Sequence, residues 1–141
     1  MSCIDKKWKI SFYCGLLFIV FSSDLLYRNV SEYLKIPFDG CPTYLQMLIN
    51  SALFGLTLRL FMKGNYDNLD KWRYTYYTWF MFIFLNNPLT YNLVDGFLHN
   101  YIDVANGNCP TQLGVYVHAI VFIIMLRFSM NLENKKENKS D

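Results

Sequence analysis

The fold is decided by the stretch CPTYLQMLINSALFGLTLRLFM, residues 41–62, which returns later in the chain as CPTQLGVYVHAIVFIIMLRFSM, residues 109–130. Of the 22 aligned positions, 8 are identical, including the Cys-Pro-Thr opening and the Leu-Arg pair near the end. Each copy is apolar over about 20 residues, the length of α-helix that crosses a hydrocarbon core of roughly 30 Å. The two copies therefore predict membrane-spanning helices over 43–62 and 111–130. We call this match the even-span alignment.

Two further apolar blocks, 8–27 and 72–94, also match when Lys7-Trp8 is aligned with Lys71-Trp72, with 9 identities in 28 positions. We call this match the odd-span alignment. Because both matched segments occur in the same order, a tandem duplication accounts for them. We predict an all-α membrane protein with four transmembrane helices, arranged as two tandem parallel-repeat hairpins. The hairpins are 1–66 and 67–131, and a disordered polar tail, 132–141, follows them.

The basic residues predict the orientation of the spans in the membrane. Of the 13 lysines and arginines, 11 fall on the side of the termini and the 63–71 loop, and 2 fall on the other side. Cytoplasmic loops carry the excess of positive charge, so both termini are expected in the cytoplasm. The loops 28–42 and 95–110 are expected to face the lumen or the exterior. Six aromatic residues are expected to anchor the spans at the interfaces: Trp8, Tyr27, Tyr44, Trp72, Tyr74 and Tyr91.

The repeated motifs at the span ends have mainly structural interpretations. Each Cys-Pro-Thr is interpreted as a helix start, with proline in the first turn and the threonine hydroxyl bonded to a free N–H. Cys41 and Cys109 occupy equivalent non-cytoplasmic positions, so they either form a disulfide between the hairpins or stay reduced. Arg59 and Arg127 end their spans on the cytoplasmic side, where long basic side chains extend toward the lipid headgroups. The alternative is that they bind anionic lipid or an internal protein layer.

Polar residues in the non-cytoplasmic half of the spans form the sharpest candidate site. Polar groups in lipid normally face the bundle interior and pair there. We expect a ring of interhelical hydrogen bonds, and the alternative is a narrow path for ions or protons. The members of this candidate intramembrane polar layer are Asp24, Asn50, Asn86, Asn87 and His118.

No sequence motif indicates an enzyme, a bound cofactor or a metal. The chain has no GxGxxG, P-loop, HExxH, GxSxG or CxxC pattern, and its four cysteines lack metal-site spacing. His99 lies in a polar loop and is expected to be solvated, without a carboxylate partner. No basic patch with interleaved aromatics indicates nucleic-acid binding. We therefore expect no catalytic, cofactor or metal site and no nucleic-acid partner.

The segment CPTQLGVYVHAIVF, residues 109–122, resembles a segment of small multi-span membrane proteins encoded by giant viruses, the nucleocytoplasmic large DNA viruses. The shared pattern is the Pro-Thr start, Gly114 and then Val-His-Ala-x-Val-Phe, from which Asn50-Ser51 departs in the second span. The resemblance implies residence in a viral inner membrane or a host assembly membrane, with capsid or other membrane proteins as partners. The expected function is a structural role in a virion or assembly membrane. The alternative is a small ion channel or carrier that acts as a homo-oligomer.

Overall fold

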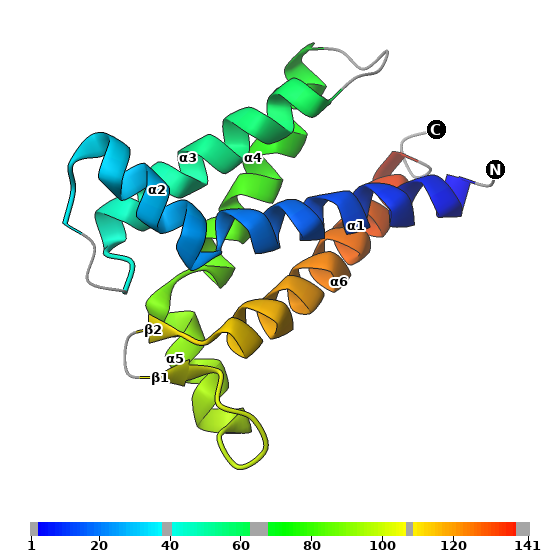
Figure 1. Ribbon diagram of the computed structural model, residues 1–141. Helices are drawn as coiled ribbons and strands as arrows, with labels where there is room; N and C mark the ends of the chain where they lie inside the picture. Colours follow the sequence, from blue (N-terminus) through cyan, green and yellow to red (C-terminus); the bar gives the residue numbers. More distant parts are fainter. Residues whose placement is uncertain (1–2, 38–40, 63–67, 107–108, 138–141) are drawn as a thin grey trace.

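The structure is a computed structural model that describes residues 3–37, 41–62, 68–106 and 109–137 (Figure 1). Most of the described chain is helical. The helices are α1 (Cys3–Phe21), α2 (Asp24–Leu34), α3 (Tyr44–Phe61), α4 (Asn68–Leu85), α5 (Pro88–Leu98) and α6 (Gln112–Glu137). Two short strands, β1 (Ala105–Asn106) and β2 (Cys109–Pro110), pair antiparallel with Ala105 opposite Pro110.

Two helices are long and apolar enough to cross a membrane: α3, with 18 residues, and Gln112–Leu132 of α6, with 21 residues. A third candidate span exists if α1 and α2, which meet at an angle of 56°, are counted as one broken span. By length and composition, the described residues thus contain two or three candidate spans. Helix α4, with 18 residues, is not among these candidates, and it contains three charged residues, Asp70, Lys71 and Arg73.

The first and third predicted spans are not continuous helices, so their predicted bounds are wrong. The chain leaves the helix at Ser22–Ser23 and again at Asn86–Asn87. Ser23 adopts an extended conformation and caps α2, because its hydroxyl accepts a hydrogen bond from the Leu26 N–H at 3.4 Å. Asn87 caps α5 in the same way, through the Leu89 N–H at 3.0 Å, and Pro88 follows it. Side chains that compete for backbone N–H groups therefore end both helices.

Both Cys-Pro-Thr triplets precede a helix, as predicted, and threonine is the capping residue in each. The Thr43 hydroxyl accepts from the Gln46 N–H at 3.4 Å, and the Gln46 side chain accepts from the Thr43 N–H at 2.8 Å. At the second triplet, the Thr111 hydroxyl accepts from the Gly114 N–H at 3.0 Å. The prolines lie before the cap and not in the first turn, which corrects that detail.

The four long helices are paired across the two halves of the chain. The most extensive helix contacts join α1 to α6 and α3 to α4. The two pairs meet near the middle of the molecule and diverge toward the ends of α1 and α6 that carry the termini (Figure 1). Helices α2 and α5, with the β1–β2 hairpin, lie at the opposite end. Both termini are therefore at the same end of the bundle.

A cluster of four phenylalanines holds the two pairs together. Phe18, Phe54, Phe82 and Phe122 come from α1, α3, α4 and α6, and each is 0% exposed. Phe54 stacks on Phe82 with centroids 4.3 Å apart, and Phe18 lies 5.0 Å from Phe122 and 5.3 Å from Phe82. Aromatic pairs at such distances gain energy beyond the area that they bury. This cluster is the point where all four long helices meet.

Helix α6 continues to Glu137, so the predicted boundary of the disordered tail at 132 is wrong. The continuation contains Leu132, Glu133, Lys135 and Lys136, which are residue types with good helix propensity. The final part of the predicted tail, 138–141, lies outside the described residues.

Gly114 provides a test of the packing between α6 and the segment before β1. A Cβ added at Gly114 would meet the Val104 carbonyl, whose carbon would lie at 2.9 Å, whereas one added at Gly96 meets nothing within 4 Å. We expect Gly114→Ala to lower the unfolding free energy in detergent micelles by about 1–3 kcal/mol, because backbone cannot move aside easily. The matched control Gly96→Ala, within α5, should be neutral or stabilising by up to about 1 kcal/mol. Equal melting temperatures for the two variants would contradict this packing.

Candidate functional site

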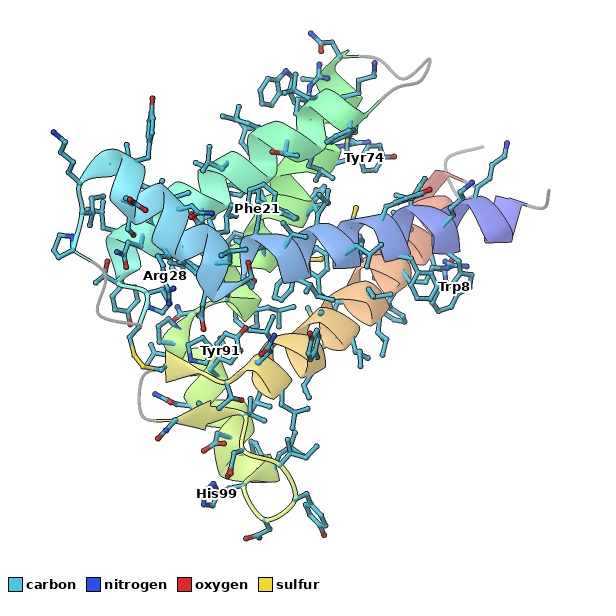
Figure 2. All side chains as sticks on the ribbon, viewed as in Figure 1. Trp8, Phe21, Arg28, Tyr74, Tyr91 and His99 are labelled. Atoms are coloured by element: carbon cyan, nitrogen blue, oxygen red, sulfur yellow. A yellow bond between two sulfur atoms is a disulfide. The ribbon has the colours of Figure 1, made fainter. Side chains whose placement is uncertain are left out.

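Polar side chains gather where α1 gives way to α2 and α4 gives way to α5. We call this group the polar centre. Each member is at most 6% exposed, although the group lies among apolar helices. Figure 2 shows one member, Tyr91, in the middle of the molecule. The members are Ser22, Tyr27, Asn50, Asn86, Tyr91 and His118.

At the break between α1 and α2, the Phe21 carbonyl accepts a hydrogen bond from the Asn50 side chain. The Asn50 Nδ2 donates to the Phe21 carbonyl at 3.2 Å, so α3 is fixed to the end of α1. Its other amide atom, Oδ1, is buried and makes no hydrogen bond with the described residues. Asn50 therefore has one satisfied and one unsatisfied polar atom.

A side-chain hydrogen bond between Tyr27 and Asn86 joins the two breaks. The Asn86 Nδ2 donates to the Tyr27 hydroxyl oxygen at 2.7 Å. Both side chains are almost fully buried. A hydrogen bond in such surroundings is not weakened by competing water, so it fixes α2 against the end of α4.

In the second half of the chain, Tyr91 and His118 are the residues that the two alignments pair with Tyr27 and Asn50. Their rings meet edge to face, with centroids 3.9 Å apart. The Tyr91 hydroxyl makes no hydrogen bond with the described residues, and the same holds for the Ser22 hydroxyl. Neither ring nitrogen of His118 is bonded with good geometry, although the Gly114 backbone lies nearby. Several polar atoms of the centre are thus buried without a partner among the described residues.

Three of the five predicted layer residues are buried in the structure: Asn50, Asn86 and His118. Asp24 is exposed in the first turn of α2, and Asn87 is half-buried as the cap of α5, so these two expectations are wrong. The helix breaks cause both differences, because they turn the chain before these side chains could face the interior.

Three members of the polar centre, Ser22, Tyr27 and Tyr91, do not belong to the predicted polar layer. The sequence predicted Tyr27 and Tyr91 as interface anchors, whereas both are buried. The available signal was the odd-span alignment, which pairs these two tyrosines with each other and also pairs Ser22 with Asn86.

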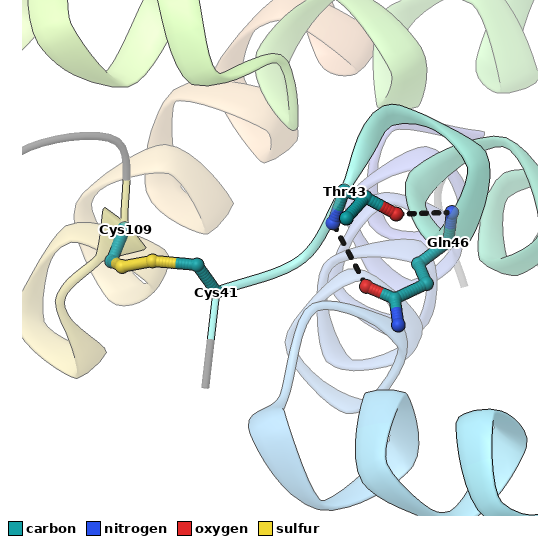
Figure 3. The surroundings of a disulfide bond; sticks show 4 residues. All are labelled: Cys41, Thr43, Gln46 and Cys109. Carbon is teal, nitrogen blue, oxygen red and sulfur yellow. Dashed lines mark hydrogen bonds between the residues drawn. A yellow bond between two sulfur atoms is a disulfide. The ribbon is translucent and has the colours of Figure 1, made fainter. Parts of the chain in front are cut away.

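Cys41 and Cys109 are joined by a disulfide in the structure, with Cα atoms 5.0 Å apart (Figure 3). This separation lies within the usual range for disulfides. The bond links the residues before α3 to strand β2, and therefore one predicted hairpin to the other. The same figure shows the reciprocal bonds of Thr43 and Gln46 that begin α3. Cys14 is buried in α1 with a free thiol.

Arg59 and Arg127, the two basic residues at helix ends, each lie over a tryptophan ring. Arg59 is 5.2 Å from the centroid of Trp72, and Arg127 is 5.4 Å from that of Trp8. Each guanidinium also donates to an asparagine, Asn68 or Asn131. These contacts are cation–π interactions that tie α3 to α4 and α6 to α1. They favour the structural interpretation of both arginines.

The connection after α5 contains a second group of ionisable side chains. The Asp95 Oδ1 accepts the backbone N–H groups of Val104 and Ala105 at 2.8 and 3.1 Å. These bonds, from Ala105 and Val104, lower the pKa of the Asp95 carboxyl below its ordinary value of 3.8. The His99 Nδ1 lies 3.6 Å from Asp95 and 3.5 Å from Asp103. His99 is exposed at the C-cap of α5, where this connection begins (Figure 2), and the expectation that it has no carboxylate neighbour is wrong.

Asp95, His99 and Asp103 can each offer one ligand atom to a metal ion, and these atoms lie within 4.8 Å of one another. Two of the three side chains are exposed, and exposed acidic groups commonly occur without a metal. The group therefore explains how the connection is held to α5, and it carries no metal assignment.

Comparison of the chain with protein-family models, curated proteins and solved structures gives no match. The resemblance of residues 109–122 to giant-virus membrane proteins stays a prediction.

The disulfide gives a direct test of how the two halves are joined. The protein should migrate faster on a denaturing gel without reductant than with it, because the bond closes a loop between cysteines whose sequence separation is 68. Cys41→Ser or Cys109→Ser should abolish this difference and lower the unfolding free energy by about 4 kcal/mol. Cys14→Ser is the matched control and should leave the shift intact. A shift that persists in Cys41→Ser would refute the pairing.

The backbone bonds to Asp95 predict a pH-dependent contribution to stability. Since the folded-state pKa is lowered, the stabilisation is present above the ordinary value of 3.8 and is lost as the pH falls through the lower folded value. Asp95→Asn should therefore melt at a lower temperature than the wild type at pH 7, and the gap should narrow below about pH 4.

The control for this experiment is Asp103→Asn, which removes the other carboxylate beside His99 and leaves both backbone bonds of Asp95 in place. It should melt close to the wild type at pH 7. A difference between wild type and Asp95→Asn that stays constant from pH 7 to pH 3 would exclude the proposed cause.

Proposed function

We propose that the chain is an integral membrane protein with four spans, α1, α3, α4 and α6, and that its role is structural. These helices have 19, 18, 18 and 26 residues. At 1.5 Å per residue they are roughly 27–39 Å long, close to the thickness of the hydrocarbon core. In this proposal, α2 and α5 lie beyond the spans, on the non-cytoplasmic side.

The bounds of the helices support a tandem duplication. Helices α2 and α5 begin at residues that the odd-span alignment pairs, and they also end at paired residues. Helices α1 and α4 end at paired residues, and α3 and α6 begin at residues that the even-span alignment pairs. We therefore propose two parallel hairpins, with both termini on the cytoplasmic side. The matching bounds are Asp24 with Pro88, Leu34 with Leu98, Phe21 with Leu85, and Tyr44 with Gln112.

The observation that carries the structural role is the phenylalanine cluster. One ring from each proposed span meets at a single level, and all four rings are 0% exposed. Aromatic rings in close contact leave no polar route through that level of the bundle. A closed, apolar centre is compatible with a structural membrane protein. It is incompatible with an ion channel whose pore runs through a single copy of the chain.

The outer faces of the proposed spans support contact with lipid. Large apolar side chains cover them and are exposed in the single chain, which in water would be unfavourable. In a bilayer the same side chains would contact acyl chains or neighbouring membrane proteins. Examples are Leu16, Val20, Leu56, Leu60, Phe80, Phe84, Ile120, Ile124 and Phe128.

The setting that we propose is a viral inner membrane or a host assembly membrane, with capsid or membrane proteins as neighbours. It rests on the resemblance of residues 109–122. The second candidate function is transport by a small channel or carrier, acting as an oligomer. The buried and unbonded nitrogens of His118 favour it, because an ionisable residue inside a membrane often marks an ion path.

Reconstituted vesicles can separate the two functions and test the four spans. A structural protein should give vesicles whose ion flux equals that of protein-free vesicles, since the phenylalanine cluster closes the bundle. In a Cys3→Ser background, Lys6→Cys and Glu32→Cys, both at exposed positions, should react with an impermeant maleimide from opposite sides. Asp103→Cys should react from the same side as Glu32→Cys.

Three outcomes would overturn these proposals. A flux above that of protein-free vesicles that falls with His118→Ala or Asp24→Asn would replace the structural role by transport. Labelling of Glu32→Cys and Lys6→Cys from the same side would exclude the four-span topology. For the viral setting, absence of the protein from purified particles and infected-cell membranes would remove it.

A further inference from the structure

The two helix breaks are related by the odd-span alignment, but their side-chain contacts differ. The alignment pairs Tyr27 with Tyr91 and Ser22 with Asn86. In the structure, the Asn86 side chain bonds the Tyr27 hydroxyl at 2.7 Å. The related contact would join Ser22 to Tyr91. Neither of these hydroxyls has a partner among the described residues, although Ser22 is 2% exposed and Tyr91 is 1% exposed.

The difference follows from the lengths of the two side chains. Asparagine carries a carboxamide that reaches across to the tyrosine hydroxyl, and serine ends one carbon earlier with a single hydroxyl. A buried hydroxyl without a partner is unfavourable, because it has lost its hydrogen bonds to bulk water. Ser22 and Tyr91 both carry such a hydroxyl, at the positions that correspond to Asn86 and Tyr27. This indicates that a polar group occupies the space that the longer asparagine side chain fills in the other contact.

A third unpaired buried atom belongs to Asn50, which bonds the chain beside Ser22. Asn50 donates to the Phe21 carbonyl, which directly precedes Ser22, and its Oδ1 is buried without a partner among the described residues. Asn50 is 0% exposed. The group thus offers two hydroxyls, which can donate or accept, and one oxygen that can only accept.

We propose that the polar centre is a binding site for one buried water molecule, which bridges the Ser22 hydroxyl, the Asn50 Oδ1 and the Tyr91 hydroxyl. The hydrogen bonds balance: the water donates to Asn50 and to one hydroxyl, and it accepts from the other hydroxyl. Buried waters typically make about three such bonds to polar groups that lack protein partners. The water replaces the carboxamide that the second half of the chain supplies as Asn86.

The charges at the site favour a neutral occupant. The polar centre contains no carboxylate and no lysine or arginine, and the nearby Asp24 and Arg28 are both exposed. An ion without a counter-charge would be strongly disfavoured among apolar helices. A single internal water is compatible with a structural bundle and with a transporter alike, so its presence does not depend on the proposed function.

The sign of two stability changes tests the proposal. If a water bridges the hydroxyls, Ser22→Ala and Tyr91→Phe should each lower the melting temperature in micelles, by about 2–4 °C. Their combined effect should be smaller than the sum, because both substitutions break one network. If the site is dry, each substitution removes an unsatisfied group, and the melting temperature should rise or stay unchanged. That second result would overturn the proposal.

A direct measurement identifies the water itself and does not depend on any variant folding. Nuclear magnetic resonance of the wild type in micelles should show a cross-peak between long-lived water and the backbone amide proton of Ser22 or Ser23. Ser22→Asn, which supplies the missing carboxamide, should abolish the cross-peak and keep or raise the melting temperature. The control Tyr27→Phe, which acts on the direct bond to Asn86, should retain it. Absence of the cross-peak in the wild type would refute the site.

Discussion

Everything else in this fold depends on the packing of Phe18, Phe54, Phe82 and Phe122 against one another. Each long helix contributes one ring, and the rings close into a single buried cluster. The odd-span alignment pairs Phe18 with Phe82, and the even-span alignment pairs Phe54 with Phe122, so the cluster lies where the two halves of the chain meet. Helices packed through such a centre can diverge on either side of it, as the two pairs do toward the termini (Figure 1).

The contacts on the side of the termini repeat across the two halves. Arg127 over Trp8 corresponds to Arg59 over Trp72, and Ser11 beside Met130 corresponds to Thr75 beside Met62. Gly15 and Gly55 each receive a bulky side chain from the partner helix, Ile123 and Trp79. Pairing of α1 with α6 and of α3 with α4 satisfies all of these contacts at once. The proposed duplication thus explains why the helices pair across the halves.

The sequence was sufficient for the helical class, the positions of α3 and α6, and the threonine caps, because those signals are local or repeat. It was insufficient at the helix breaks. Ser23 and Asn87 end a helix by bonding the backbone, and an apolar block gives no sign of whether that bond or the helix prevails. Asp24 and Tyr27 then exchange their expected places, since the turn exposes one and buries the other. His99 lies four residues from both Asp95 and Asp103, so the sequence spacing did carry a signal for its carboxylate neighbours.

The two halves differ where α1 and α4 end, and the differences are chemical as well as geometric. Asn50 satisfies the carbonyl of Phe21, whereas the related His118 turns its ring to Tyr91. Asn86 reaches Tyr27, whereas Ser22 does not reach Tyr91. Under the proposed duplication, asparagine at both positions would give two matching contacts, and they differ because Ser22 stands where the other half has Asn86. Under the proposed duplication, the contact of Tyr27 with Asn86 keeps its direct hydrogen bond, and the contact of Tyr91 with Ser22 is the one that could hold an internal polar site.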